Sequence, residues 1–525
     1  MILKKEAERT KQESIVAIGS PSSDCIAKVQ EEVVLPGYDA GIDESGVQHS
    51  QDKLKGSADR LFATLTSISS SQQVKDSDDE RKVVVNSDQL HRSSIIGGLS
   101  KDCIQTFYCE NEEETLTYRC RCNFQIVLVE HEGATCYRYA MRSMGKPVLL
   151  GTKNSFPIAT NRIQSAMDYL MEQLNSSDGT VIGQNGHLTS CTFSSAWNDT
   201  PDADCILTLH YDQPLNPNIN TKTIWIQQAS ILCQKMKLRQ INGRSKGTLL
   251  SVGGNDSTSA DDKDGATIRD TIFLLRNACE DTRNEWKVSL DSSTQSTASA
   301  ISVHYDKPET AFYHPNANAM KKALSWMLNR LEYIASSSSN QKLNILEMYC
   351  GCGAHTVALG RSGLVSKIIA VELDPRLVSG CKANIAKNSL QDLVEVRRGD
   401  AGKWAKEESR KRRSRKIRAS SGDNTAPSNQ DNYYDVLLVD PPRQGLDEEV
   451  CKMAMMSMDG GIGSGESCFR NLLYVSCGHK ALLRDLERLS PFYEVENCAQ
   501  MDLFPRTDSI ETLVHLKRRQ STEKK

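Results

Sequence analysis

The sequence lacks long apolar runs, and this shortage excludes whole classes of protein. No stretch approaches the roughly 18 consecutive apolar residues that a membrane-spanning helix needs. The opening residues lack the apolar segment of a secretory signal, and they contain Glu6, Glu8 and Glu13, which also argues against a mitochondrial leader. We therefore expect a protein that is neither secreted nor membrane-bound, located in the cytoplasm or the nucleus.

Net charge, apolar residues and paired cysteines are also scarce. The 64 basic and 67 acidic residues nearly cancel, so only a local basic patch can attract a polyanion such as RNA. Apolar residues make up 38%, a low share that indicates ordered domains diluted by polar tracts. The 17 cysteines are odd in number and irregularly spaced, which favours reduced thiols over a disulfide framework.

The composition divides the chain into regions. Residues 1–112 are rich in Ser, Asp, Glu and Lys, and we predict that they are mostly disordered. Residues 113–310 mix strand and helix patterns and predict an α+β domain with flexible insertions at about 245–266 and 290–300. Its expected elements include two strands joined by a turn, at 115–131 and 135–144, and a helix at 162–175. Residues 311–518 alternate short apolar strands with helices, which predicts a doubly wound, Rossmann-like α/β sheet ending in an antiparallel pair. A basic loop at 407–431 interrupts this domain, and 519–525 form a tail.

Two strand ends in the third region suggest a cofactor site. Gly351 and Gly353 follow its first strand, where glycine allows a tight turn and a close approach of the backbone to a ligand. Glu372 ends the second strand, where a carboxylate can accept two ribose hydroxyls. The phosphate-binding pattern is incomplete because residue 356 is Thr, so a cofactor with ribose but no phosphate fits better. S-adenosylmethionine is such a cofactor.

A candidate nucleophile and a candidate base follow. Cys477 ends the fifth strand, beside Gly478, and the positive neighbours that would help ionise its thiol are Arg443 and His479. A buried structural cysteine is the alternative interpretation. Glu511 begins an apolar strand, where partial burial would raise its pKa, although an exposed carboxylate at a strand start is an equally simple interpretation.

Motifs along the chain resemble those of the tRNA (uracil-5-)-methyltransferase family, from about residue 115 to about residue 518. The C-terminal motifs are LEMYCGCG (346–353), VELDP (371–375), VDPPRQGLD (439–447), YVSC (474–477) and FPRTDSIETLVHL (504–516). The upstream motifs are YRCRCNF (118–124), NSFP (154–157), INGR (241–244) and FYHPNANAM (312–320).

The resemblance implies an RNA-facing domain before a class I S-adenosylmethionine-dependent methyltransferase domain. It implies methylation of carbon 5 of a uridine, with the T-loop uridine 54 of tRNA as the preferred target. By resemblance Cys477 is the nucleophile, Glu511 the proton acceptor, and Asp440 the bridge between cofactor and base. The implied cofactor contacts are Tyr349, Gly351, Gly353, Glu372, Asp440 and His314. The RNA contacts expected beside them are Arg119, Arg121, Phe124 and Arg443.

Some positions depart from the family pattern. His314 stands where the family usually has Gln, Ala354 where it has Asn, and Gly478-His479 where Asn-Pro often follows the catalytic Cys. One branch of the family carries an N-terminal barrel and a four-cysteine iron–sulfur site. The spacing here does not match that site, so we predict no cluster and no metal; the cysteines concerned are Cys103, Cys109, Cys120 and Cys122.

Alternatives remain at this stage. The departures allow an RNA-binding or tRNA-folding factor with lost or weak methylation, and the same chemistry could act on ribosomal RNA. The basic run 410–418 suits RNA contact, nuclear import or simple solvation equally. The sequence indicates no oligomeric state.

Overall fold

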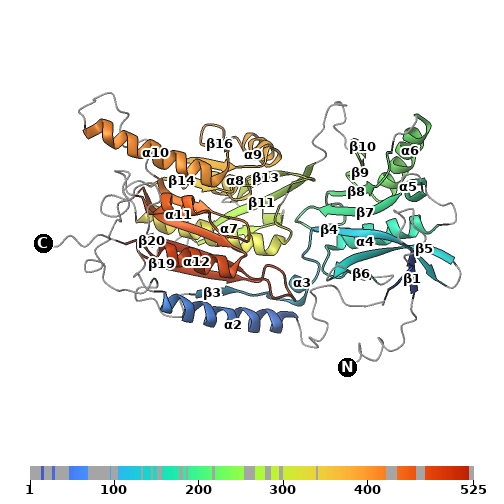
Figure 1. Cartoon of the computed structure of the whole chain (residues 1–525), viewed down its shortest axis with the longest axis horizontal. Coiled ribbons are helices and arrows are strands. Elements are labelled where there is room, and N and C mark those ends of the chain that lie inside the picture. Colours follow the sequence, from blue (N-terminus) through green and yellow to red (C-terminus); the bar gives the residue numbers. More distant parts are fainter. Residues whose placement is uncertain are drawn as a thin grey trace.

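The structure is a computed structural model of the whole chain (Figure 1). It describes residues 13–16, 26–29, 46–68, 95, 104–131, 134–143, 146–150, 156–176, 181–184, 187–215, 219–253, 267–277, 285–291, 293–294, 300–311, 313–337, 341–420, 434–456 and 468–519.

An eight-stranded sheet forms the centre of the C-terminal domain, in the order β16-β15-β14-β17-β18-β20-β19-β3. The first five strands in this order are parallel, whereas β20 runs antiparallel to both β18 and β19. The strands are β3 (Ile104–Phe107), β14 (Leu343–Met348), β15 (Val365–Glu372), β16 (Val394–Arg398), β17 (Tyr434–Val439), β18 (Phe469–Ser476), β19 (Tyr493–Met501) and β20 (Glu511–Arg518). This topology confirms the Rossmann-like fold and the terminal antiparallel pair expected from the sequence.

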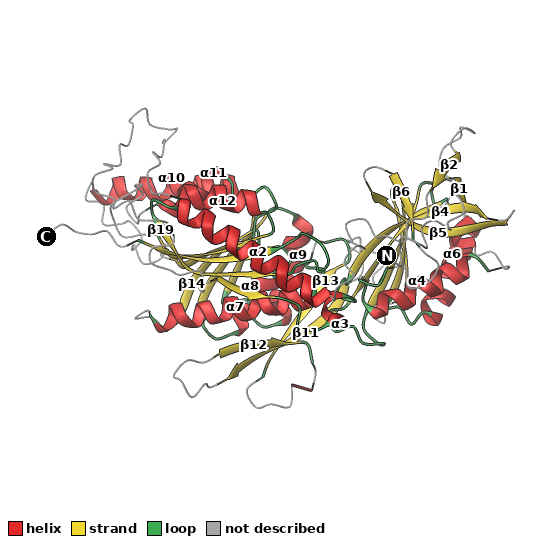
Figure 2. Ribbon diagram, turned by 90° about the horizontal axis from the view of Figure 1, so that it is seen from below, coloured by secondary structure: helices red, strands yellow, loops and turns green. Residues whose placement is uncertain are grey.

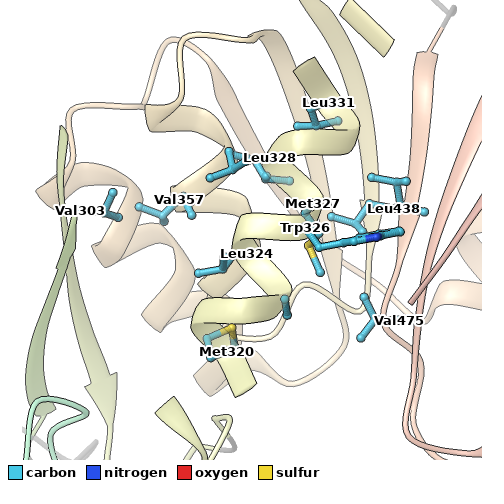
Figure 3. Close-up of a cluster of buried hydrophobic side chains, with 14 of the residues drawn as sticks. Val303, Met320, Leu324, Trp326, Met327, Leu328, Leu331, Val357, Leu438 and Val475 are labelled. Carbon is cyan, nitrogen blue, oxygen red and sulfur yellow. The ribbon is translucent and has the colours of Figure 1, made fainter. Parts of the chain in front are cut away.

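Helices cover both faces of this sheet (Figures 1 and 2). They are α7 (Ala317–Ser336), α8 (Ala354–Arg361), α9 (Pro375–Lys387), α10 (Ala401–Ser420), α11 (Glu448–Met455) and α12 (His479–Leu489). Figure 3 shows α7 packing its apolar side against Val357 of α8, Leu438 of β17 and Val475 of β18. Because apolar groups cover both faces, the strands are short continuous apolar runs rather than alternating ones.

A three-stranded sheet, in the order β12-β11-β13, packs onto the same core. Its strands are β11 (Thr267–Asn277), β12 (Glu285–Ser289) and β13 (Ile301–Pro308). Asn384 of α9 and Asn388, which caps its carboxyl end, accept hydrogen bonds from the β13 backbone at 2.6 Å and 2.9 Å. These strands fall within residues 113–310, which the sequence pattern assigned to the upstream domain, but their apolar side chains pack in one cluster with those of α7 and α8.

The upstream domain is built on a nine-stranded sheet, with the path β10-β9-β8-β7-β4-β1-β2 and with β5 and β6 attached through β4. Its strands are β1 (Glu13–Val16), β2 (Ile26–Val29), β4 (Arg121–His131), β5 (Ala134–Ser143), β6 (Lys146–Leu149), β7 (Leu188–Ser195), β8 (Cys205–Tyr211), β9 (Gln240–Ser245) and β10 (Thr248–Gly253). Its helices are α4 (Asn161–Leu174), α5 (Val181–Gln184) and α6 (Ile219–Lys235). The β4–β5 hairpin and α4 lie where the sequence predicted them. The expected flexible stretches lie largely outside the described residues, except that β10 occupies part of the first.

The N-terminal region contains more structure than predicted. A helix of 22 residues, α2 (Gly46–Ser67), packs against β3, β19 and the short helix α3 (Glu112–Thr115). The expectation of disorder is wrong for α2 and β3. Leu54, Leu61 and Leu65 recur at helical spacing along α2 and are at most 1% exposed. This stripe is short and surrounded by polar residues, so the composition of the region concealed it.

The basic segment also differs from the expected loop. Helix α10 continues through residue 420, and residues 421–433 lie outside the described part of the chain. Within the run, Arg412 is buried and donates to Glu408 at 3.0 Å and to the Cys468 sulfur at 2.8 Å. Helix α10 starts at the carboxyl end of β16 and runs back along the sheet (Figure 1). Its second half therefore lies toward the edge opposite the carboxyl ends of the parallel strands. RNA binding and nuclear import by this run stay hypotheses.

Among the described residues, no helix combines the length and the apolar character needed to cross a membrane.

Candidate active site

The register of β18 and β20 sets the geometry of the site. The two strands are antiparallel, and Ser476 pairs with Thr512. One position further along, Cys477 therefore stands opposite Glu511, the first residue of β20. Side chains at opposite positions of an antiparallel pair have Cβ atoms about 5 Å apart. Two residues separated by more than thirty positions in sequence thus meet at the carboxyl edge of the sheet, where open α/β sheets bind their ligands.

The Cys477 thiol is accessible, and charges of both signs surround it. Among the cysteines that the structure describes, it is the one classed as exposed. Partial burial and the carboxylates of Glu511 and Asp440 raise the pKa of its thiol, while Arg443 lowers it by positive charge and a hydrogen bond. The interpretation of Cys477 as a sealed structural cysteine is therefore excluded. Arg443 is the group that favours the thiolate.

Glu511 is the buried carboxyl group of the site. It is 6% exposed, and burial followed by the nearby charge of Asp440 holds its pKa well above the usual range, against the opposing effect of Arg443. A carboxyl group with a raised pKa is the stronger base once it is ionised, so this environment suits proton abstraction from a substrate.

Asp440 lies between the thiol and a group of buried side chains. The surrounding protein raises the pKa of its carboxyl group to about 7, although its side chain remains 41% exposed. A ligand that covered Asp440 would remove this remaining water and raise the pKa further. His355 Nδ1 lies 4.0 Å from Asp440 Oδ2, and burial followed by the proximity of His314 lowers the pKa of His355 to about 4.

Glu347, at the end of β14, adds a second carboxyl group behind Asp440. It is 1% exposed, and its Oε2 accepts a hydrogen bond from Thr356 at 2.7 Å, while its Oε1 has no partner among the described residues. Burial raises its pKa to about 8, and the hydrogen bond from Thr356 acts in the opposite direction. Glu347 is therefore largely protonated at neutral pH.

The Glu372 carboxylate is held ready for a ligand at the end of β15. Oε2 accepts the Gly351 N–H at 3.0 Å, and Oε1 accepts the backbone N–H groups of Leu373 at 2.7 Å and Asp374 at 2.9 Å. The carboxylate is thus oriented by the backbone, and Oε2 keeps a free lone-pair direction. This arrangement fits a ribose diol, as the sequence predicted for a cofactor without a phosphate group.

The backbone conformation of the turn between β14 and α8 accounts for the presence of two glycines in it. Tyr349, Gly351 and Gly353 all have positive φ angles, of 63°, 58° and 86°. A Cβ atom on Gly353 would also lie 2.8 Å from the Cys381 sulfur, so both the backbone angle and the available space favour glycine. The Tyr349 hydroxyl donates to Asp447 at 3.0 Å. Burial, then Asp447, raises the Tyr349 pKa, so its phenol stays protonated.

The loop after β17 and the helix after Cys477 are tied together by Asp485 of α12. Its side chain is completely buried, and Oδ2 accepts both the Leu446 N–H at 2.7 Å and the Tyr474 hydroxyl at 2.9 Å. At the other end of the loop, the Arg443 carbonyl lies where a side chain at Gly478 would stand. These contacts hold Arg443 beside the thiol.

Of the remaining predicted residues, His314 lies at the site, whereas Arg119 and Arg121 contact other parts of the protein. His314 lies near His355, and burial lowers its pKa to about 4, so its ring is neutral at pH 7. Arg119 lies over the Phe504 ring at 5.4 Å, and Arg121 donates to the Ala311 carbonyl at 2.6 Å. Both arginines therefore contact protein groups where the upstream and C-terminal domains meet.

The prediction for Phe124 is wrong. The side chain is 2% exposed and sits in an aromatic cluster of the upstream domain, with the Phe156 ring centroid 5.0 Å away. It fills the core between the sheet and α4, and it cannot stack on a base. An aromatic residue in an alternating strand pattern points to one of two faces, and the sequence alone did not decide which face was solvated.

Three residues with structural roles at the site were not predicted. His355 lies on α8 and Asp485 on α12, and their burial depends on packing that no local pattern reveals. Lys53 comes from α2 and reaches the loop before Glu511, a contact across 449 positions of sequence.

The chain is similar in sequence to known RNA-modifying proteins. Residues 289–519 match the family described as tRNA (Uracil-5-)-methyltransferase. A tRNA/tmRNA (uracil-C(5))-methyltransferase of Acinetobacter baumannii (strain ACICU) is 26% identical over 404 residues, covering 76% of this chain and 90% of the relative. One from Stutzerimonas stutzeri (strain A1501) is 26% identical over 406 residues, covering 77% and 88%.

The tRNA (uracil-54, C5)-methyltransferase of Pyrococcus abyssi, in complex with S-adenosyl-L-homocysteine, is 13% identical with a TM-score of 0.48, and the match covers 97% of this chain and 94% of that one.

Proposed function

We propose that this protein methylates carbon 5 of a uridine in tRNA, because residues 289–519 match the family described as tRNA (Uracil-5-)-methyltransferase. The observation that carries the proposal is the register that sets the accessible Cys477 thiol opposite Glu511, with Arg443 and Asp440 beside it. The T-loop uridine at position 54 is the proposed target, as the resemblance implies. An enzyme acting on tRNA would work in the nucleus or the cytoplasm, where tRNA is made and used.

The residues present fit S-adenosylmethionine as the cofactor. Glu372 would accept its ribose hydroxyls, and the turn of Gly351 and Gly353 allows the backbone to lie close to it. Tyr349 and Asp440 would contact it from the ends of β14 and β17. The cofactor supplies the methyl group, and the chain supplies everything needed to make carbon 5 of uracil reactive.

Cys477 would start the reaction, because carbon 5 of uracil is too weak a nucleophile by itself. The thiolate adds to carbon 6 of the ring, and the electron pair moves to give an enolate whose carbon 5 is nucleophilic. Arg443 supports this step, since its charge and hydrogen bond favour the thiolate. The target base must first leave its stack, which costs a few kcal/mol, so that carbon 6 can reach the thiol.

Glu511 would complete the reaction. After methylation, carbon 5 carries both the methyl group and a hydrogen, and the thiol cannot leave until that hydrogen is removed as a proton. The Glu511 carboxylate accepts it, the ring double bond re-forms, and the Cys477 thiolate is expelled. Because burial raises the pKa of both Cys477 and Glu511, the rate should rise toward alkaline pH as the two groups ionise.

Methyl transfer from labelled S-adenosylmethionine to unmodified tRNA tests the proposal directly. We expect one methyl group per tRNA, at a uridine, and mapping of the modified position should give the T-loop. Binding of tRNA without methyl transfer would favour the alternative of an RNA-binding or folding factor. Transfer to ribosomal RNA in preference to tRNA would correct the substrate and keep the chemistry.

A further inference from the structure

Helix α2 is an integral part of the C-terminal domain, although it lies far upstream in the sequence and outside the segment that matches the family. Figure 1 shows it running along β3, beneath α12 and β19, and α2 contacts β3 and β19 directly. Leu61 and Leu65 enter the same buried cluster as the side chains of β17, β18 and β20. A helix anchored in this way can fix the position of a neighbouring loop.

The loop in question joins β19 to β20 and leads directly into Glu511. Leu503 and Phe504 anchor the first part of this loop in apolar clusters. The part that follows is held by polar contacts of Arg506, Thr507 and Ser509. On one side, Arg506 donates to the Thr115 hydroxyl at 3.2 Å and pairs with Glu112, beside the α2 residue Gly46, whose N–H also donates to Glu112. Arg506 itself has a positive φ angle of 64°.

Lys53 of α2 holds the other side of this loop. Its ammonium group donates to Asp502 Oδ1 at 2.5 Å, to the Thr507 carbonyl at 2.7 Å and to the Ser509 carbonyl at 3.3 Å. The Lys53 and Asp502 side chains are 6% and 1% exposed. All three ammonium protons thus have acceptors that belong to one loop, and Ser509 is two residues from Glu511.

We propose that Lys53 is a positioning residue of the methyl-transfer reaction, through which α2 fixes the loop that places Glu511 opposite Cys477. The inference rests on the proposed function, and it assigns to a helix outside the family segment a role in removing the carbon 5 proton. Without the ammonium group, Asp502 is left buried without its ion pair and two loop carbonyls lose their donor. The loop then takes other conformations, and Glu511 is correctly placed for a smaller fraction of the time.

The step that suffers should be proton removal rather than binding. Cys477 directly follows β18 and is hydrogen-bonded to Arg443, and α12 begins two residues later, so formation of the covalent bond to carbon 6 does not depend on Lys53. Displacement of a catalytic group by about 1 Å costs up to roughly a hundredfold in rate. We therefore expect kcat to fall by about ten- to a hundredfold, with KM for tRNA changing little, and the covalent enzyme–tRNA intermediate to accumulate.

The test compares Lys53→Met with Lys55→Met in the full chain. Lys55 lies on the same helix and is exposed, so its replacement removes an equal charge without touching the loop. The readouts are kcat and KM for tRNA methylation and the fraction of protein that migrates as an RNA adduct on a denaturing gel. We expect Lys53→Met to lower kcat and to raise the adduct fraction, and Lys55→Met to behave as the wild type.

Two further variants keep the test decisive. Lys53→Arg keeps the charge but not the geometry of three donors on one atom, and it should show the same defects in a weaker form. It replaces Lys53→Met in the test if that variant fails to fold. Asp502→Asn leaves Lys53 bound to the two carbonyls and should have a smaller effect than Lys53→Met. Equal kcat and equal adduct fraction in the Lys53 variants and Lys55→Met would overturn the role of Lys53. Absence of methylation by the wild type would instead overturn the proposed function.

Discussion

Replacing Gly478 by Ala should disturb the thiol through a defined contact. The φ angle at Gly478 is −116°, which alanine adopts without strain, so the effect comes from space alone. An alanine Cβ would lie 2.4 Å from the Arg443 carbonyl oxygen, whereas ordinary contact begins at 3.4 Å. The two backbones must therefore separate by 3.4 − 2.4 = 1.0 Å.

The size of the effect follows from this separation. Overpacking of this kind costs about 1–3 kcal/mol of stability. The movement also pulls Arg443 away from Cys477, which removes the group that lowers the thiol pKa. A misplacement of about 1 Å at a catalytic group can cost on the order of a hundredfold in rate, so we expect kcat/KM for methylation to fall by roughly that factor.

Thiol labelling provides an assay that is independent of methylation. The rate at which iodoacetamide modifies Cys477, followed by mass spectrometry of its peptide, should fall severalfold in Gly478→Ala at neutral pH because less thiolate is present. Gly399→Ala is the matched control, since its Cβ would lie 3.8 Å from the nearest atom, on Trp404. Wild-type labelling and turnover in Gly478→Ala would refute the assigned roles of this contact and of Arg443.

Three other predictions concern the carboxyl groups of the site. Glu511→Gln should bind tRNA and form the covalent adduct but release it slowly, so the adduct should accumulate on a denaturing gel; absence of the adduct would argue against Glu511 as the base. Glu372→Gln should weaken S-adenosylmethionine binding at least tenfold by calorimetry, through the lost acceptor for ribose, without changing the melting temperature of the free protein by more than a few degrees. Burial raises the pKa of Glu347 from 4.5 to about 8. The stabilising contribution of its protonated form is therefore fully present below pH 4.5 and is lost as the pH rises through 8. Between pH 5 and pH 8, the free energy of unfolding of Glu347→Gln, measured in urea, should therefore rise by on the order of a few kcal/mol relative to that of the wild type. If the two proteins instead show parallel dependences of this free energy on pH, the burial of an ionisable carboxyl group at this position is contradicted.

The central sheet could be predicted because its strands are apolar on both faces. Runs such as 434–439 have no competing helical periodicity, and turn residues bound them, so a mostly parallel sheet and its carboxyl edge followed from general rules. The same rule made part of the candidate site predictable, because Glu372 ends one parallel strand and Asp440 directly follows another. The resemblance implied the roles of Cys477 and Glu511, whereas the strand register that brings them together became evident only in the fold.

Other features depend on long-range packing and could not be predicted. The apolar stripe of α2 is diluted by charged residues, and its stability comes from a surface formed by β3 and β19. The α10 helix was interpreted as a loop because its arginines suggested solvation, yet Arg412 is buried and donates to the Cys468 sulfur, 56 positions further along the chain. Phe124 was assigned to RNA because strand alternation does not state which face is the core. In each case the partner lies far away in sequence.

The most direct test of the account is to identify the atom that links protein to RNA. We expect tRNA containing 5-fluorouridine to form a stable adduct in the presence of S-adenosylmethionine, because fluorine at carbon 5 cannot be removed as a proton. Mass spectrometry of the digested adduct should place the modified base on the peptide that contains Cys477, and Cys477→Ala should form no adduct and no methylated tRNA. A base attached to any other residue, or methylation by Cys477→Ala at the wild-type rate, would contradict the account.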